Sequence, residues 1–547
     1  MKIKLKKNSF LEGSIIATLA IIFTKLLGAL YVIPFYKIIG VSGGSLYSYA
    51  YNIYVLFLNI SSAGIPIAIS KIISEYNALK YYYSKEKSYK IGKRVVFIIS
   101  IICFFVLFLF SRFFAHLIIG NSISENSIED ISLVIKSVSF CLLIVPYLSV
   151  MKGYLQGHKF ISPSSISEII EQVVRITIVL LGSFIVINIL KKKVCIGVSV
   201  AVLGAFFGGF SAYLYLSHKI RKNRNLFNTK KVLKEDNVSN KEIIKKIIKY
   251  SIPFIIISVV TNVYSMTDLS LIIRGLSSLG YNGHDAESIS SIISTWGGKI
   301  CIIITSISLG MSINIIPNIV NNHIKKDYKE IESKIIKALN IILYISLPLS
   351  IFISINSDNL YTLFYGNNEY GIIILRYLPF VSLLSSIQII LNMVLQGLNE
   401  YKTVYLNTIV GFIINAILDI PLMRLFSLLG YYPYYGAITS TIIGYSISIM
   451  IIVILFTMKY NFKFKNVFKN FCKELIPLII SFTLLIVIKN YIPFNNNRLI
   501  QIPILLMFSI VVCGTYLLLT HKNGLLNNTL GDNIIKKIKS KINAKNM

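Results

Sequence analysis

The sequence predicts an all-α polytopic membrane protein with about 14 transmembrane helices. Hydrophobic residues make up 55% of the 547 residues, and the mean hydropathy is +0.70. Apolar runs of about 18–25 residues recur along the chain, and as a helix each can cross a hydrocarbon core of about 30 Å. Runs such as 98–110 are apolar on every face. The strands of a membrane barrel would instead alternate apolar and polar residues, so the spans are expected to be helices.

The expected spans follow one another with short connections. In chain order they are residues 12–34, 46–70, 95–119, 131–154, 164–190, 194–217, 250–273, 296–320, 335–356, 371–396, 403–426, 434–458, 472–491 and 499–520. The longest polar interruption divides the first twelve spans into two sets of six. We therefore expect an N-terminal six-helix lobe at 1–217, a basic cytoplasmic linker at 218–249, a C-terminal six-helix lobe at 250–460, and two additional helices with a basic cytoplasmic tail at 461–547.

Basic residues mark the segments that are expected inside the cell. The net charge is +32, and the positive clusters lie before the first span, at 71–94 with seven basic residues, and at 219–249 with eleven. The positive-inside rule then places both termini in the cytoplasm. Lysines 191–193 are the exception, because they fall in an expected external loop. The inner charges are expected to face anionic membrane lipids rather than a nucleic acid.

The two halves of the chain share a short repeat. Leu155-Gln156-Gly157 closes the fourth span, and Leu395-Gln396-Gly397 closes the tenth, 240 residues later. Six spans return the chain to the same side of the membrane, so the two repeats would be parallel. Transporters built in this way hold their substrate between the halves. A chance match in an Ile- and Leu-rich sequence is the alternative.

Lys25 is the clearest charge in an apolar span. It lies about 15 Å from either end of the first span by helical rise, which is farther than a lysine stem reaches. A charge at this depth costs about 2.5–3.5 kcal/mol on insertion scales. Lys25 must therefore face a hydrated cavity, where it could bind substrate, or pair with an acid in a structural ion pair.

Other ionisable residues lie within or beside later spans. Glu168, Glu171 and Arg175 share one face of the fifth span, where Glu171 and Arg175 can pair within the helix and leave Glu168 near the cytoplasmic mouth. Asp268 is deep in the seventh span, and the external loop after it is flanked by Arg274 and Lys299. Cations in both halves suit an anionic ligand, since a buried pyrophosphate needs paired charge and donors. A structural ion pair is the alternative for the fifth span.

A break is expected inside the second span. Ser61-Ser62-Ala63-Gly64-Ile65-Pro66 combines small residues with a proline, which removes a backbone donor from the helix. We predict a hinge at Gly64 and Pro66, with ordinary tolerance of proline in membrane helices as the alternative. The six cysteines lack metal-ligand or redox spacing, and no metal or other cofactor is expected.

Several of these motifs together resemble a known superfamily. The segment 13–44, with Thr24-Lys25 and Gly40, is similar to the opening helix of the MATE-like multidrug/oligosaccharidyl-lipid/polysaccharide exporter superfamily. The segment from Leu46 through Asn59 to Lys71, which includes Ser-Ser-Ala-Gly-Ile-Pro, resembles the second helix of its polysaccharide-transporter branch. Within that branch the likeness is to the stage V sporulation protein B and lipid II flippase group. Thr267-Asp268 and the segment 308–317 resemble that group's seventh and eighth helices.

The resemblance implies a two-lobed flippase that works by alternating access on an undecaprenyl-pyrophosphate-linked sugar. The cargo would be lipid II or a related cell-wall or spore-cortex precursor in the bacterial cytoplasmic membrane. The chain would be a monomer and not an enzyme, coupled to an ion gradient or the membrane potential. Lys25 falls where flippases of this type carry a cation in the first helix, whereas Lys299 is not clearly in register with the arginine that often begins their eighth helix. Together with the charges in and beside the spans, the predicted substrate-binding set is Lys25, Asn59, Glu168, Glu171, Arg175, Asp268, Arg274 and Lys299.

Two other functions remain open at this point. A cation-coupled multidrug exporter of the same fold would depend on Asp268 or Glu171 rather than on Lys25. A polytopic glycosyltransferase would need positioned acids or histidines for acid–base chemistry. The six histidines are dispersed, and the external loops are short. The chain also lacks a glycine-rich phosphate loop, so direct ATP hydrolysis is not expected.

Overall fold

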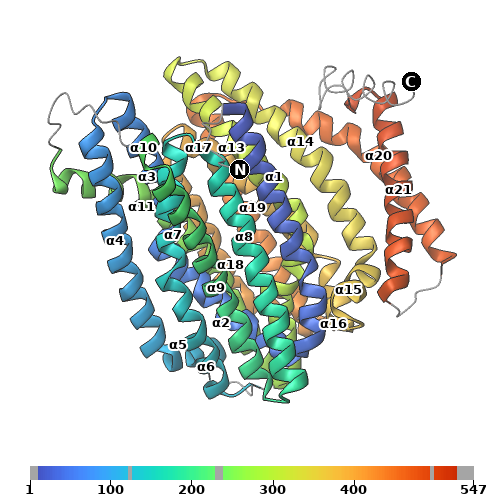
Figure 1. Ribbon diagram of the computed structural model, residues 1–547. Coiled ribbons are helices and arrows are strands. Elements are labelled where there is room, and N and C mark those ends of the chain that lie inside the picture. The colour runs from blue at the N-terminus through green and yellow to red at the C-terminus, as the bar shows by residue number, and fades with distance from the viewer. Residues whose placement is uncertain (1–9, 121–125, 228–237, 493–497, 527–547) are drawn as a thin grey trace, which may run out of the picture. The chain divides into compact units, whose positions relative to one another are not determined.

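The described part of the chain is helical throughout. The computed structural model describes residues 10–120, 126–227, 238–492 and 498–526, and every regular element in these ranges is a helix (Figure 1). Twelve helical stretches among the described residues are long and apolar enough to cross a membrane. The all-α polytopic fold class predicted from the sequence is confirmed.

Twelve of the fourteen expected spans coincide with these stretches. The other two, 12–34 and 250–273, fall on helices α1 and α11, which are not among the twelve. The exact count of fourteen spans therefore stays a prediction.

The chain divides into two compact units, Met1–Trp296 and Gly297–Met547. The predicted lobes and linker were defined by the expected membrane topology, whereas these two units are defined by packing. The predicted boundaries therefore stay a prediction. The first unit contains α1 (Phe10–Leu30), α2 (Val32–Ser62), α3 (Ile65–Ala78), α4 (Tyr82–Leu109), α5 (Ser111–Ile119), α6 (Ile128–Ser139), η1 (Phe140–Leu143), α7 (Val145–Gly157), α8 (Ile161–Thr177), η2 (Ile178–Gly182), η3 (Ile185–Ile189), α9 (Val194–Lys222), α10 (Arg224–Phe227), α11 (Asn240–Ser278), α12 (Gly283–Ser291) and η4 (Ile292–Trp296).

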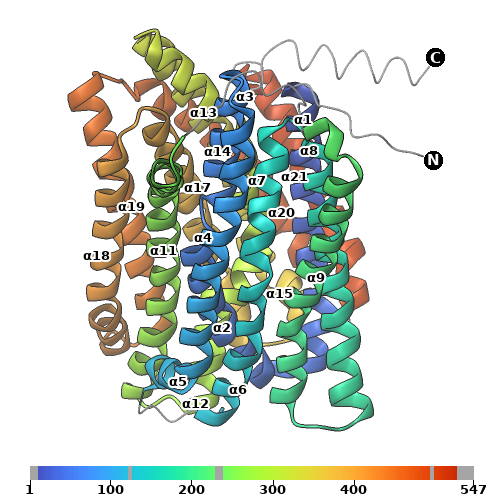
Figure 2. The ribbon, with the colours of Figure 1, turned by 60° about the vertical axis from the view of Figure 1, so that its left-hand side comes forward.

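The first unit has two distinct ends. Figure 2 shows α5, α6 and α12 at one end and α3 at the other. By the expected topology, the end with α5, α6 and α12 would be the external one.

The second unit is built from nine helices within the described residues. They are α13 (Gly297–Ile324), α14 (Tyr328–Ile355), α15 (Ser357–Tyr365), α16 (Glu369–Leu375), α17 (Leu378–Gly397), α18 (Tyr401–Leu428), α19 (Tyr434–Tyr460), α20 (Lys465–Asn490) and α21 (Arg498–Lys522). The two additional helices α20 and α21 dock on α14 through an apolar cluster. Polar contacts reinforce it, because the Tyr516 hydroxyl donates to Glu474 Oε1 at 2.7 Å and the Tyr344 and Thr520 hydroxyls lie 2.9 Å apart.

The second span breaks where the sequence predicts. Helix α2 ends at Ser62 and α3 begins at Ile65, and between them Gly64 has φ 73° and ψ −13°. A Cβ on Gly64 would lie 2.6 Å from the Phe254 Cβ, so both the backbone conformation and the close packing require glycine. Pro66 then occupies the first turn of α3, where its missing N–H costs no hydrogen bond. The break is confirmed, while motion about it stays a prediction.

The repeated Leu-Gln-Gly tripeptides end their helices with the same turn. After Gly157 the chain places Lys159 at φ 65°, and the Phe160 N–H donates to the Leu155 carbonyl at 2.9 Å. After Gly397 it places Asn399 at φ 61°, and the Glu400 N–H donates to the Leu395 carbonyl at 2.8 Å. A left-handed residue followed by this long-range bond satisfies carbonyls at a helix end. The same turn follows other helices of this chain, for example at Lys80 and Lys326, so the repeat itself stays a prediction.

Glu400, in the second of these turns and outside the expected spans, joins that turn to the end of α19. It accepts hydrogen bonds from the Lys459 ammonium and from the Tyr460 hydroxyl, the latter at 2.7 Å. Burial by itself would raise the pKa of Glu400, but these two donors and the charge of Lys459 outweigh it and hold the pKa below its ordinary value.

The basic linker is anchored at its described ends. The Phe227 side chain is 2% exposed and lies 5.3 Å from the ring centroids of both Tyr154 and Phe160. The Lys85 ammonium donates to the Phe227 carbonyl at 2.9 Å. Residues 228–237 of the predicted linker lie outside the described residues. The linker is therefore not merely a solvated charge run, because an apolar residue at its start is part of the core.

Candidate functional site

Lys25 on α1 faces α8 within the first unit. Its side chain is half-buried, and the charge that acts on it within the described residues is the cation of Arg175. The two helices can approach because Gly28 lies one turn from Lys25, and a Cβ there would be 3.3 Å from the Gln172 Nε2. Two cations from different helices therefore share one region. Among the residues that the structure describes, the charge next to Lys25 is thus a cation and not an acid, and the hydrated cavity stays a prediction.

Arg175 lies among tyrosine hydroxyls. Its Nη2 donates to the side-chain oxygen of Gln172, and Tyr31, Tyr47 and Tyr51 are close enough to act on it electrostatically. The Tyr31 and Tyr47 hydroxyls lie 3.4 Å apart, and the Tyr47 and Tyr51 rings stack with centroids 5.8 Å apart. Hydroxyls can donate as well as accept, so the tyrosines do not neutralise Arg175, and the charge of Glu171 also acts on it.

The acids of α8 pair with a residue that sequence reasoning missed. Lys152 on α7 places its Nζ 3.2 Å from Glu171 Oε2 and 3.6 Å from Glu168 Oε1. The interpretation that Glu171 pairs with Arg175 inside the helix is therefore wrong for this structure, because Glu171 turns to α7. Lys152 lies near the end of the fourth expected span. Two acids on one face of an apolar helix need a cation nearby, and this need could have pointed to Lys152 in the sequence.

Two glycines on α9 set the position of α8. A Cβ on Gly208 would lie 2.5 Å from the Glu171 carbonyl oxygen, and one on Gly204 would lie 2.9 Å from that of Arg175. Small residues at helix interfaces let backbones approach closely. The backbone of α8 is therefore seated directly on α9 at the two residues whose side chains carry opposite charges.

The remaining predicted site residues lie elsewhere. Asn59 is half-buried on α2, and Asp268 is 7% exposed on α11. The Arg274 Nη2 donates to the Leu117 carbonyl at 2.8 Å, near the end of α5, where a cation satisfies a helix C-terminus. Lys299 stands near the start of α13 in the second unit, with its Nζ buried. The structure thus places Lys25 near Arg175, and it pairs Glu168 and Glu171 with Lys152.

A polar seam joins α2 to the segment that follows α12. The Ser48 and Thr295 hydroxyls lie 2.6 Å apart, and the Asn52 Nδ2 donates to Thr295 Oγ1 at 3.1 Å. The Trp296 indole donates to the Gly44 carbonyl at 3.2 Å. Neutral small side chains carry no charge signal in the sequence, which is why the seam was not predicted.

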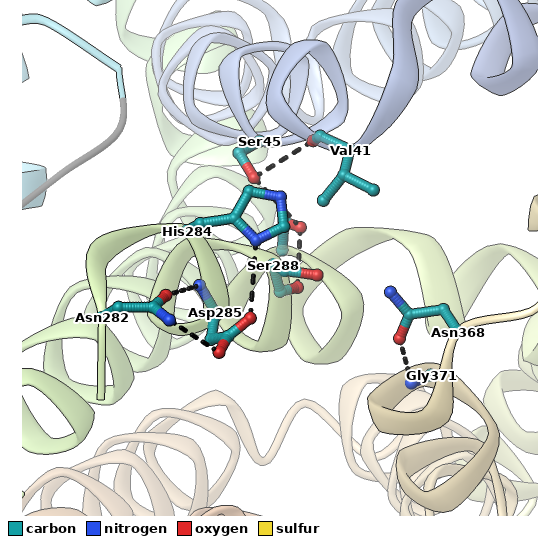
Figure 3. A network of polar contacts seen from close by, with 9 residues as sticks. Val41, Ser45, Asn282, His284, Asp285, Ser288, Asn368 and Gly371 are labelled. Carbon is teal, nitrogen blue, oxygen red and sulfur yellow. Dashed lines mark hydrogen bonds and ion pairs between the residues drawn. The ribbon is translucent and has the colours of Figure 1, made fainter. Parts of the chain in front are cut away.

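Next to this seam lies a capping network at the start of α12 (Figure 3). The Asn282 side chain accepts from the Asp285 N–H at 2.8 Å, and His284 Nδ1 lies 3.4 Å from Asp285 Oδ1. Ser45 of α2 reaches Ser291 at 3.5 Å. These contacts fix where α12 begins and hold it against α2. Within the described residues, no three His, Cys, Asp or Glu side chains converge as a metal site.

Comparison with protein families identifies the group to which this architecture belongs. The family model described as "Polysaccharide biosynthesis protein" matches residues 10–283. This chain belongs to that family. The MatE family model also matches residues 253–420 of this polysaccharide biosynthesis protein, which extends the likeness into the second unit.

Curated relatives of this family member include a flippase and a sporulation protein. It is 28% identical over 539 residues to "Lipid II flippase MurJ" of Bacillus subtilis (strain 168), with 96% of this chain and 97% of the relative covered. It is 23% identical over 416 residues to "Stage V sporulation protein B" of the same organism, covering 75% and 77%. This family member is therefore a multi-pass protein of the bacterial cytoplasmic membrane and not an enzyme.

Solved structures share the fold at low identity. "Lipid II flippase MurJ, inward closed conformation" aligns with a TM-score of 0.65 and 16% identity, covering 94% of this chain and 99% of that structure. An inward-facing multidrug resistance MATE family transporter of the MOP superfamily aligns with a TM-score of 0.60 and 16% identity, covering 80% and 96%. The superfamily resemblance read from the sequence is confirmed.

Proposed function

We propose that this protein is a flippase that moves a lipid-linked glycan across the cytoplasmic membrane by alternating access. The cargo is an undecaprenyl-pyrophosphate-linked sugar, either lipid II or a related cell-wall or spore-cortex precursor. The names of the relatives, which include a lipid II flippase over nearly the whole chain, support this assignment.

The observation that carries the proposal is the pair of cations Lys25 and Arg175. They come from two helices of the first unit that meet where Gly28, one turn from Lys25, packs against Gln172, the residue to which Arg175 donates. Two like charges held together within apolar spans repel each other and lack full hydration, so an anion between them relieves both costs. A pyrophosphate offers several oxygens to a lysine and to the fork of an arginine.

The other predicted residues complete the proposed site. Asn59 and Asp268 supply polar groups within the spans, and Glu168 and Glu171 lie beside Arg175. Lys299 also stays in the predicted set. Arg274 stays in the predicted set, although its hydrogen bond to the Leu117 carbonyl of α5 favours a structural role.

The proposed topology and energetics follow from the charge distribution. Both termini lie in the cytoplasm, where basic segments face anionic lipids. The protein works as a monomer, and Gly64 and Pro66 form a hinge. An ion gradient or the membrane potential drives transport.

Complementation tests the proposal. In cells depleted of their lipid II flippase, the wild-type chain is expected to restore growth, and Lys25→Ala and Arg175→Ala are expected to fail. Losing one charged hydrogen-bonding group costs about 1.5–3 kcal/mol, or at least tenfold in affinity. Lys136→Ala is the matched control, since Lys136 is an exposed lysine at the edge of a span. Growth with both alanine variants at the wild-type rate would remove the cation pair from the mechanism.

A cation-coupled multidrug exporter is the second candidate. The MatE match and the buried Asp268 favour it. This function predicts that Asp268→Asn abolishes the efflux of organic cations while Lys25→Ala retains it. The flippase proposal predicts that the wild-type chain gives no such efflux in a drug-sensitive strain.

A further inference from the structure

Helix α8 carries an acid and a base at the spacing where a helix normally pairs them. Glu171 and Arg175 are four residues apart, the separation at which opposite charges attract along a helix surface. If they paired, Arg175 would be neutralised and would be a poor ligand for an anion. The structure instead sends the two side chains in different directions.

Lys152 on α7 is the reason for this separation. Its Nζ lies within ion-pair distance of both Glu168 and Glu171, at 3.6 and 3.2 Å, and the three side chains are 16%, 33% and 19% exposed. Helix α7 is held at this place by the Gln156 Nε2, which donates to Ser164 Oγ at 3.1 Å at the start of α8. One lysine thus holds both carboxylates of α8.

Arg175 makes its own contacts on the side of the tyrosines. Its guanidinium donates to Gln172 and lies near the hydroxyls of Tyr31, Tyr47 and Tyr51. The charge of Glu171 still acts on Arg175, but the ion pair of Glu171 is with Lys152. Lys152 with its two acids carries an excess negative charge, and Lys25 with Arg175 carries two positive charges.

We propose that Lys152 is a positioning residue that keeps Glu168 and Glu171 away from Arg175, so that Arg175 remains available with Lys25 for an anion. This inference rests on the proposed function in that it takes the anion to be the pyrophosphate of the cargo. Without Lys152 two poorly hydrated carboxylates lose their cation. The nearest replacement is Arg175, one turn from Glu171, and pairing with it would cancel the charge that the anion needs.

The test compares Lys152→Met with the double variant Lys152→Met/Glu171→Gln, using the full-length protein in nanodiscs. Binding of undecaprenyl pyrophosphate is expected to weaken about tenfold in the single variant. It is expected to recover to within about threefold of wild type in the double variant, because no carboxylate one turn away can then capture Arg175. Lys152→Arg is expected to bind like wild type, and Lys136→Met is the control for losing a lysine. Undecaprenol, which lacks the pyrophosphate, is expected to bind all variants alike.

A purely structural ion pair gives a different pattern. If Lys152 merely fastened α7 to α8, the double variant would lose at least as much thermal stability and binding as the single variant. Failure of the double variant to recover binding would overturn the proposal, as would wild-type binding by Lys152→Met.

A second readout does not depend on the cargo. Modification of Arg175 by phenylglyoxal, followed by mass spectrometry, is expected to slow at least threefold in Lys152→Met and to return to the wild-type rate in the double variant. If undecaprenyl pyrophosphate fails to bind the wild-type protein while this reactivity pattern holds, the proposed function fails and the role of Lys152 stands. Unchanged reactivity in Lys152→Met refutes the role of Lys152 whatever the cargo is.

Discussion

Replacing Gly208 by alanine tests whether the close contact of α9 with α8 positions the charged site. A Cβ at this position would lie 2.5 Å from the Glu171 carbonyl oxygen and 3.2 Å from the Arg175 Cβ. An ordinary carbon–oxygen contact is about 3.3 Å, so one helix must move by about 0.8 Å. Both neighbouring groups belong to α8 itself, and neither can give way by rotating about a side-chain bond.

The size of the effect follows from two opposing contributions. Alanine in place of glycine inside a helix normally stabilises by about 0.5–1 kcal/mol. Overpacking costs about 1–3 kcal/mol. We therefore expect a net destabilisation of about 1 kcal/mol, and a melting temperature lower by about 1–2 °C. A displacement of about 0.8 Å also exceeds the tolerance of about 0.5 Å within which binding groups must be held, so cargo binding is expected to weaken.

Thermal unfolding of the purified protein, followed by intrinsic fluorescence, measures the first effect, and binding of undecaprenyl pyrophosphate measures the second. Gly514→Ala is the matched control, because Gly514 is also inside a helix but a Cβ there would have no neighbour within 4 Å. The control is expected to keep or raise the melting temperature. If Gly208→Ala melts as high as Gly514→Ala and binds cargo like wild type, the contact does not position α8.

Three further predictions follow from other parts of the structure. Phe227→Ala is expected to cost about 3–5 kcal/mol, because it empties a buried aromatic site, and to speed proteolysis at the linker. Oxidation of a Ser48→Cys/Thr295→Cys pair, whose hydroxyls lie 2.6 Å apart, is expected to cross-link α2 to the segment after α12 and to stop cargo transport until it is reduced. Glu400 has a lowered folded-state pKa, so its stabilising contribution is present above the ordinary pKa of 4.5 and is lost as the pH falls through the folded value. The melting temperature of the wild type is therefore expected to fall more steeply on acidification below pH 4.5 than that of Glu400→Gln.

Each of these predictions has a control in the same chain. Leu226→Ala changes an exposed neighbour of Phe227 and is expected to leave stability unchanged. A Ser111→Cys/Ser132→Cys pair, with hydroxyls 2.9 Å apart on α5 and α6, is expected to cross-link without stopping transport. Full transport by the oxidised Ser48→Cys/Thr295→Cys protein would show that α2 and the segment after α12 need not separate during transport.

The sequence by itself determined the features that depend on local composition. Helical spans follow from apolar runs, because a backbone in lipid must satisfy its own hydrogen bonds. The break at Gly64 and Pro66 follows from local residue chemistry, because glycine allows a positive φ and proline lacks a backbone donor. The turns after Gly157 and Gly397 are equally local.

Only the tertiary structure decided which charges meet. The spacing of Glu171 and Arg175 predicted a pair along α8, but a lysine on a neighbouring helix supplied a competing partner. The burial of Phe227 and the seam of Ser48 and Thr295 also depend on segments far apart in the chain. Periodicity describes one helix at a time, whereas an ion pair forms with whichever charge packing brings within about 4 Å.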